Sequence, residues 1–227
     1  EIYTLSLHDA LPICRAPAAV TAARYAGLRE MPQRGWEPVT IPGAVSGWAA
    51  LSQRFGALPF ADLFEPAIHY ARDGFPVSPN VARQWRRAAA VLPHDLGFGA
   101  HFLPRGRAPD PGETFACAPL AATLAAIAES RGEAFYRGAL AQAMVDDARA
   151  HGALHTLADF AAHAVEWVAP LGLDWQGVRV HEMPPNGQGV AALMALGMLS
   201  QLDVASLPAD SVASQHLQIE AMKLAFA

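Results

Sequence analysis

"VEWVAPLGLDWQGVRVHEMPPNGQGVAALMALGML", residues 165–199, changes its pattern halfway along and decides the fold class. Its first half alternates, contains many β-branched and aromatic residues, and predicts two strands joined by a turn near Trp175 to Gly177. After Pro184 and Pro185 the apolar residues become nearly continuous, and we expect a helix from about Gln188 to Gln201. Because the rest of the chain has helical spacing, the sequence predicts an α+β, mostly helical fold.

The turn before this helix has the spacing of a dinucleotide-binding motif, with Gly187, Gly189 and Ala192 at G-x-G-x-x-A. Such a motif needs a second strand after the helix, ending in an acidic residue roughly 20 positions on. Here a polar and then helical stretch follows instead, so we interpret residues 184–189 as a structural turn. The two glycines are expected to adopt conformations that other residues avoid. The amides of Asn186 and Gln188 could orient a substrate, and the backbone N–H groups at the helix start could receive an anion.

Helices are predicted over most of the remaining chain from the spacing of apolar residues and from the caps. In the helix through Phe55, we expect Val45, Trp48, Ala49 and Leu51 to form the buried face. Pro66 predicts either a kink or a helix that starts near Glu65. Ser78 and Thr156 are predicted N-caps, and Asp159 completes a capping box with Thr156. The predicted helices cover about residues 22–28, 42–55, 60–73, 79–91, 119–130, 133–150, 157–163 and 211–227, with a long loop over 92–118.

The composition excludes several classes of protein. The chain has 227 residues, 52% hydrophobic and 16% charged, which is typical of a globular chain with ample core. Its net charge of −5 and the lack of a basic stripe make nucleic acid an unexpected partner. The longest apolar run, Val190 to Leu199, is too short to span a bilayer. Cys14 and Cys117 cannot form a disulfide framework.

Both ends of the sequence differ from what a whole domain would show. "EIYTLSLHDALPIC", residues 1–14, closely resembles the translation of a sequencing adapter, and we expect it to be non-native. "IEAMKLAFA", residues 219–227, stops within a helical pattern that has no cap. We therefore expect residues 15–227 to be a fragment. No signal peptide is visible at the start, and a cytoplasmic or periplasmic location stays open because the true N-terminus is expected to be missing.

No motif in the sequence forms a complete active site. Ser46 in "GAVSGW" stands one residue too late for the G-x-S-x-G motif, and Cys117 is expected to be a buried, inert thiol. His151 and His155 are four residues apart, but Gly152 interrupts the helix that would place them on one face, so no metal site is predicted. From the residues alone, the sequence predicts a helical globular fragment.

Four ordered stretches together resemble the γ-glutamyltransferase (glutathione hydrolase) family. Residues 40–78 resemble the P-G-x-x-x-G segment of that family and the two helices after it, and residues 102–144 resemble its next segment, which contains "FYRG". "HEMPPNGQG", residues 181–189, stands where most members carry Pro-Pro-x-Ser-Ser-Gly-Gly, and residues 219–227 resemble a helix that normally continues into Asp-Arg. The resemblance covers residues 15–227, which it places in the middle of the large subunit.

The resemblance implies an N-terminal-nucleophile hydrolase with an αββα sandwich. Members are proenzymes that cut themselves, and the new N-terminal Thr of the small subunit attacks an amide carbonyl. A pair of glycines stabilises the oxyanion. The nucleophile and the glycine pair lie beyond this chain, so it is expected to contain no catalytic residue and to be inactive alone. The implied partners are the small subunit and a small-molecule amide, with no cofactor and no metal.

The resemblance also suggests substrate-binding residues. The family uses an Arg in an R-E-x-A-P context to grip the α-carboxylate of the substrate. Here Ile13 occupies the matching position before Ala16 and Pro17, which leaves Arg15 as the candidate substitute. The other candidates belong to the turn, and they are Asn186, Gly187, Gln188 and Gly189.

The turn sequence leaves the substrate open. Asn-Gly-Gln-Gly in place of Ser-Ser-Gly-Gly is typical of a side branch that includes oxamate amidohydrolase-like proteins, so γ-glutamyl specificity is not assured. The alternatives are another amidohydrolase or acylase of the same family and a catalytically inactive helical scaffold.

Overall fold

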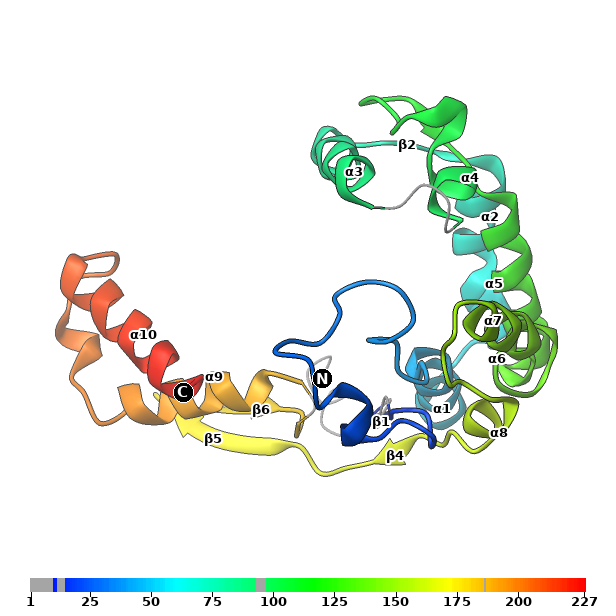
Figure 1. Ribbon diagram of the computed structural model, residues 1–227. Coiled ribbons are helices and arrows are strands. Elements are labelled where there is room, and N and C mark those ends of the chain that lie inside the picture. The colour runs from blue at the N-terminus through cyan, green and yellow to red at the C-terminus, as the bar shows by residue number, and fades with distance from the viewer. Residues whose placement is uncertain (1–9, 12–14, 93–96, 186) are drawn as a thin grey trace. The chain divides into compact units, whose positions relative to one another are not determined.

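The computed structural model describes residues 10–11, 15–92, 97–185 and 187–227, and these form two compact units. The larger unit comprises residues 15–163. The smaller unit comprises residues 164–227 together with the segment 1–14, of which residues 10–11 are described. Figure 1 labels the α-helices and most of the strands of both units.

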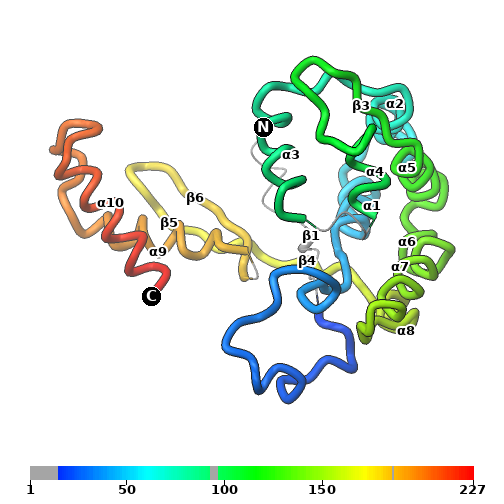
Figure 2. Tube along the Cα trace, turned by 45° about the horizontal axis from the view of Figure 1, so that its top comes forward, coloured from blue at the N-terminus to red at the C-terminus, as the bar shows by residue number. Residues whose placement is uncertain are grey.

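The larger unit is built almost entirely from helices. α2 and α5 lie side by side in it (Figures 1 and 2), and β2 and β3 form a short antiparallel pair. Its elements in chain order are η2 (Ala22–Tyr25), α1 (Ala44–Phe55), η3 (Ala61–Phe64), α2 (Glu65–Asp73), β2 (Phe75–Pro76), α3 (Pro79–Val91), α4 (Phe98–Phe102), η4 (Pro104–Gly106), β3 (Thr114–Phe115), α5 (Ala118–Ser130), α6 (Glu133–Arg137), α7 (Ala139–Ala150) and α8 (Leu157–Ala161).

Local signals place several of these helices where the sequence predicts them. α2 starts at Glu65 after a short 3₁₀ turn, so Pro66 lies in the first turn of the helix, where its missing N–H costs nothing. The Ser78 hydroxyl caps α3 by accepting from Val81 N. Thr156 and Asp159 form the predicted capping box of α8, with both reciprocal hydrogen bonds present.

Two predictions of secondary structure in the larger unit are wrong. Residues 133–150 form two helices because Gly138, with φ −120° and ψ −158°, leaves the helical conformation between α6 and α7. The stretch predicted as a long loop contains α4 and β3; the pairing of β3 with β2 supplies a partner that no local pattern reveals.

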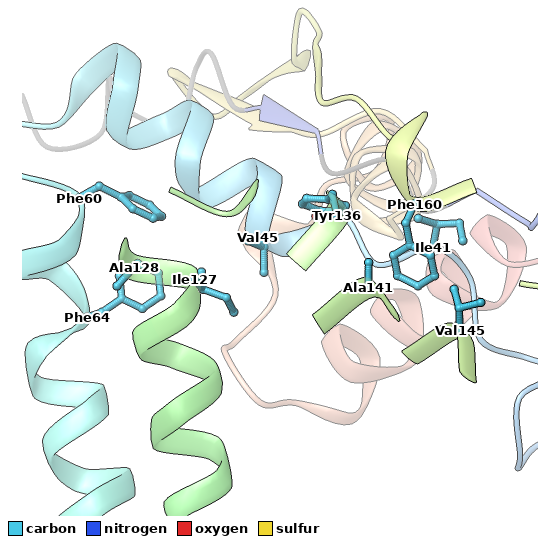
Figure 3. Packing of buried hydrophobic residues seen from close by; sticks show 10 residues of the cluster. All are labelled: Ile41, Val45, Phe60, Phe64, Ile127, Ala128, Tyr136, Ala141, Val145 and Phe160. Carbon is cyan, nitrogen blue, oxygen red and sulfur yellow. The ribbon is translucent and has the colours of Figure 1, made fainter. Parts of the chain in front are cut away.

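The core of the larger unit joins α1, α5, α6, α7 and α8 (Figure 3). Phe160 and Ile41 are fully buried, and Phe60 packs edge-to-face on Phe64 with ring centroids 4.9 Å apart. Trp48, predicted to be buried, is 46% exposed, because only part of the apolar face of α1 is covered. The cluster consists of Ile41, Val45, Phe60, Phe64, Ile127, Ala128, Tyr136, Ala141, Val145 and Phe160.

The smaller unit contains the predicted hairpin and two packed helices. Gln176 and Gly177 both have positive φ, 47° and 83°, as expected in a type I′ turn between twisted strands. α9 packs on α10 and on the hairpin, and Ala195, Leu199 and Ala221 form a small core. The elements are β1 (Ala10–Leu11), β4 (Glu166–Trp167), β5 (Leu171–Trp175), β6 (Val178–Glu182), α9 (Gly189–Leu199), η5 (Val204–Ser206) and α10 (Val212–Ala225), with β1 antiparallel to β4 and β5 antiparallel to β6.

Candidate functional site

The sequence-predicted site residues fall in both units. Arg15 belongs to the larger unit, whereas Gly187, Gln188 and Gly189 belong to the smaller one. Asn186 lies outside the described residues. The candidate site residues therefore have two separate local environments, one in each unit.

Arg15 lies at the edge of a buried polar cluster in the larger unit. Its Nη2 donates to the carbonyl oxygen of Asp159 over 3.2 Å, and its own carbonyl accepts from Ile41 N over 2.9 Å. These two bonds join the segment that carries Arg15 to α8 and to the chain before α1. The side chain of Arg15 remains exposed beyond them.

Asp159 is the centre of this cluster and is only 4% exposed. One carboxylate oxygen accepts from Ala18 N over 2.8 Å. The other accepts from Thr156 N over 3.0 Å and from the Thr156 hydroxyl over 2.6 Å. Burial alone would raise the pKa of Asp159, but the hydrogen bonds from Thr156 and Ala18, assisted by the charge of Arg15, outweigh it and hold the pKa below its usual range. Asp159 is thus a charged anchor that ties residue 18 to α8, in addition to its predicted role as a helix cap.

Ser46 and His163 form a pair that sequence reasoning missed. The Ser46 hydroxyl lies 2.8 Å from His163 Nε2 and 2.7 Å from the carbonyl oxygen of Gly43. The ring of Tyr136 stacks on His163 with centroids 5.0 Å apart, and its hydroxyl accepts from Ser46 N and donates to the carbonyl of Pro42. Ser46 and His163 are 117 positions apart in the chain, so no local signal could have joined them.

This serine–histidine pair has the distance of an activated nucleophile but the wrong hydrogen-bond pattern. Ser46 has one proton, and both short contacts are satisfied only when it donates to Gly43 and His163 Nε2 donates to it. Burial, and second the charge of Arg15, lower the pKa of His163, which keeps the ring neutral at pH 7. The oxygens of Asp159, the buried carboxylate of the cluster, are already bound to Ala18 and Thr156. The pair therefore connects α1 to the end of α8 and is not a catalytic dyad.

In the smaller unit, the turn leads directly into α9. Gln188 is the N-cap residue and is exposed, with φ −92° and ψ 8°. Gly189 is the first residue of α9, so the expectation that it takes a conformation closed to other residues is wrong. Glycine is needed there for a different reason: a Cβ atom would lie 2.8 Å from Cδ of Glu182 and 2.9 Å from its Cβ. At Gly187 a Cβ atom would meet no neighbour within 4 Å.

The Glu182 carboxylate thus approaches the N-terminus of α9, where the helix dipole favours negative charge. Any substrate anion at this helix start would share the position with a carboxylate of the protein itself. The start of α9 is therefore occupied by a carboxylate of the chain itself.

The described residues contain no cluster of three or more His, Cys, Asp or Glu that could hold a metal ion. Cys117 is 6% exposed and precedes α5, as expected for a buried thiol. Within the described ranges, none of the helices is both long enough and apolar enough to cross a membrane.

Comparison with known proteins gives consistent matches over nearly the whole chain. The family model described as Gamma-glutamyltranspeptidase matches residues 13–227. The chain is 38% identical over 213 residues to a glutathione hydrolase-like proenzyme, YwrD, of Bacillus subtilis, and 37% identical over 220 residues to the oxamate amidohydrolase proenzyme of Klebsiella pneumoniae. Each match covers 93% of this chain but 41% of the relative. The solved structure of a cephalosporin acylase from Bacillus halodurans superposes with a TM-score of 0.86 and 42% identity, over 96% of this chain and 42% of that one.

Proposed function

The chain belongs to the gamma-glutamyltranspeptidase family, and we propose that it is part of the large subunit of a self-cleaving amide hydrolase or acyltransferase. The resemblance and the fold class predicted from the sequence are confirmed: this mostly helical α+β chain has the fold of the N-terminal-nucleophile hydrolases of this family. The chain spans 41% of the length of these two curated relatives. The activity is therefore proposed for a longer protein.

One observation carries the proposal. The matched segment runs through both units without interruption, from residue 13 to residue 227, and the relatives are named as a hydrolase, an amidohydrolase and an acylase. These names share an acyl group as the part that is cleaved off or transferred. An inactive scaffold has no comparable support among them.

The proposed chemistry uses a nucleophile outside this chain. The hydroxyl of the N-terminal Thr of the small subunit attacks the amide carbonyl, and the amine leaves as the acyl-enzyme forms. Backbone N–H groups stabilise the oxyanion, and water or an amine then releases the acyl group. No metal or cofactor takes part in this proposal.

Within this chain, Arg15 is the proposed contact for a substrate carboxylate. A guanidinium has five N–H donors, and the bond to the Asp159 carbonyl uses one Nη, so a bidentate grip would need Arg15 to present its remaining donors. Replacing Arg15 with Lys tests the role: KM for a carboxylate-bearing substrate should rise about tenfold, the effect of losing a charged hydrogen bond. An unchanged KM would assign Arg15 to anchoring alone.

Gly187, Gln188 and Gly189, with Asn186 before them, are the proposed wall of the acyl pocket. Gln188 is exposed and caps no backbone N–H with its side chain, so its amide can serve a substrate. Replacing Gln188 with Ala should therefore change the ratio of kcat/KM values between two acyl donors and leave the thermal midpoint of unfolding in place. Equal losses for both donors would contradict a role in selectivity.

The remaining part of the proenzyme is the proposed partner of α10. Val212, Ile219 and Leu224 of α10 are 87%, 56% and 63% exposed, and Phe226 directly after the helix is 58% exposed. Hydrogen exchange of the α10 amides should slow in the longer protein relative to this chain alone. Equal exchange rates would exclude that partner.

The activity itself is tested with the full-length protein. We expect purification to yield two polypeptides from one gene product, and expect release of ammonia from oxamate or of aniline from a γ-glutamyl anilide. This 227-residue chain serves as the negative control. A full-length protein that stays uncut and turns over neither substrate, nor an acylated cephalosporin, would overturn the proposal and favour a scaffold.

The second candidate function is that of an acylase. It is favoured by the 42% identity to the solved structure of the cephalosporin acylase. The two candidates differ in the acyl group that they accept, so the same three assays separate them. Highest kcat/KM for the cephalosporin substrate would assign the chain to the acylases.

The segment of residues 1–14 is proposed to be foreign to the protein. Its described residues, Ala10 and Leu11, pair with Trp167 and Glu166 over two positions only. Deleting residues 1–14 should leave the thermal midpoint unchanged within error, because a two-residue ladder on an exposed strand adds little. A drop of several degrees would show that the segment belongs to the fold.

A further inference from the structure

The larger unit has a pocket whose residues belong neither to the sequence motifs nor to the proposed function. It is a cavity of about 430 Å³ between the chain before α1 and the end of α7. It is lined by Arg34, Gly35, Trp36, Glu37, Val39, Asp147 and His151. All of these belong to one unit, so the pocket does not depend on how the two units are arranged.

The carboxylate of Asp147 and the indole of Trp36 are joined in this pocket. Trp36 Nε1 donates to Asp147 Oδ2 over 2.7 Å, which holds the indole against the last turn of α7. His151 Nδ1 bonds the carbonyl oxygen of Asp147 over 2.8 Å and lies 3.6 Å from the same carboxylate oxygen. An anion beside an aromatic ring at the negative end of a helix dipole is an arrangement that suits an organic cation.

The second carboxylate of the pocket, Glu37, is ionised, and its charge is already balanced by Arg24. Arg24 binds both of its oxygens, at 2.5 Å and 3.2 Å, and the Tyr25 hydroxyl donates to it over 2.5 Å. The hydrogen bonds from Arg24 and Tyr25 hold the pKa of Glu37 down at about 2. Glu37 therefore shapes the wall, and Asp147 is the carboxylate that can balance a ligand cation.

Arg34 adds the opposite charge to the lining. Its Nη1 donates to the carbonyl of Val91, which positions the side chain, and the guanidinium carries five N–H donors in all. Such a group binds carboxylates and repels an isolated cation. A ligand that satisfies the lining must therefore carry both an ammonium and a carboxylate.

His155 lies outside the lining and contacts two of the lining residues, Trp36 and Val39. The His155 ring is 5% exposed and packs edge-on against Trp36, with centroids 5.0 Å apart. His155 Nε2 bonds the carbonyl oxygen of Val39 over 2.9 Å. Because that oxygen can only accept, Nε2 carries the hydrogen, and both Trp36 and Val39 are held in place.

From this geometry we propose that the pocket binds the zwitterion of a small amino acid. The ammonium binds the Asp147 carboxylate beside the indole of Trp36, and the carboxylate lies on Arg34. The site is separate from the polar cluster around Asp159 and holds no group of the proposed acyl-transfer chemistry. Its ligand is thus a bound effector, not a substrate.

The test is a titration of the full-length protein at pH 7 with L-alanine, ethylamine and propionate, followed by isothermal calorimetry. Ethylamine lacks the carboxylate and propionate lacks the ammonium. Alanine should bind saturably, and the other two should bind about tenfold more weakly or worse, the loss expected for one charged hydrogen bond.

Two variants assign the binding to this pocket. Asp147→Asn should weaken alanine about tenfold and leave propionate unchanged, and the amide oxygen still accepts from Trp36 Nε1, so the fold is kept. Arg34→Gln should weaken the binding of alanine and propionate and should strengthen that of ethylamine, because it removes a charge that repels a cation. The matched control is Asp146→Asn, one position away on α7 and outside the lining, which should change nothing.

Each contrary result overturns the proposal. Alanine binding that survives both variants lies elsewhere in the protein. Equal binding of alanine and ethylamine would show an ammonium site without carboxylate recognition, and no saturable binding would show an empty pocket.

Discussion

The two units of this chain hold their structure in different ways. In the larger unit the core is built from large side chains, with Phe60, Phe64, Tyr136 and Phe160 all at most 7% exposed. In the smaller unit the core is formed by Ala195, Leu199 and Ala221, and every residue of the β5–β6 hairpin is exposed or only half-buried. The larger unit therefore buries large aromatic side chains within itself, whereas the buried cluster of the smaller unit consists of small and aliphatic side chains.

The larger unit also buries more polar side chains than the smaller unit. Among the described residues, the larger unit buries His155, Asp159 and His163, and the smaller one buries only Ser214. Asp159 and His163 are hydrogen-bonded to distant parts of the chain and so specify one arrangement of it, whereas Nδ1 of His155 has no hydrogen-bond partner among the described residues. Four measurements test this difference between the two units.

The largest effect is expected for the core itself. Phe160→Ala removes a fully buried ring from the larger unit and should lower its free energy of unfolding by about 3–5 kcal/mol. Leu224→Ala, on a side chain 63% exposed in α10, should change stability by less than about 0.5 kcal/mol. Urea unfolding of both variants measures this. Equal effects would show that the two units form one cooperative core.

The next effect concerns the anchor of the polar cluster. Asp159→Asn places an amide NH₂ against the donors of Thr156 and should cost about 2–3 kcal/mol at pH 7. Since the folded-state pKa of Asp159 is lowered, its contribution is full above the unfolded pKa of about 3.9 and is lost as the pH falls towards the folded pKa.

The variant should therefore lose the acid sensitivity that this carboxylate confers. Asp174→Asn on the exposed hairpin, where the carboxylate pairs with Arg179, should cost less than about 0.5 kcal/mol. If Asp174→Asn lowers the free energy of unfolding as much as Asp159→Asn does, the predicted difference between the two units is wrong. Unfolding curves at pH values from 7 to 2 measure both variants.

A smaller, pH-dependent effect is expected at His163. Its pKa is lowered in the folded state, so the unfolded chain binds the proton more readily. Stability is then full above the unfolded pKa of about 6.5 and falls as the pH drops below it, by at most about 1.4 kcal/mol per pH unit for one proton. His163→Gln should flatten this fall, while His216→Gln, on an exposed residue of α10, should leave it in place. Thermal midpoints between pH 7.5 and 5 decide between these outcomes.

The smallest effect is expected at the turn of the smaller unit. Gly189→Ala brings a methyl group against Glu182 and should cost about 1 kcal/mol, whereas Gly187→Ala meets open space and should stay within about 0.5 kcal/mol. Adding Glu182→Ala to Gly189→Ala should restore the loss. If the double variant is no more stable than the single one, the close approach of Glu182 is not the reason for the glycine.

Local structure and family membership follow from short stretches of the sequence. Ser78 and Thr156 cap their helices, Pro66 falls in the first turn of α2, and the hairpin turns at Gln176 and Gly177, because each of these signals acts between residues a few positions apart. The motif stretches over residues 40–78, 102–144, 181–189 and 219–227 likewise identified the family without any contact being known.

Only the tertiary structure decided what those residues do. Ser46 meets His163 across 117 positions, Trp36 meets Asp147 across 111, and Ala18 meets Asp159 across 141. The reason for glycine at position 189 is the side chain of Glu182 and not the local backbone. Contacts of this kind depend on which helices pack together, and packing depends on the shape and burial of many side chains at once, which no pattern along the chain encodes locally.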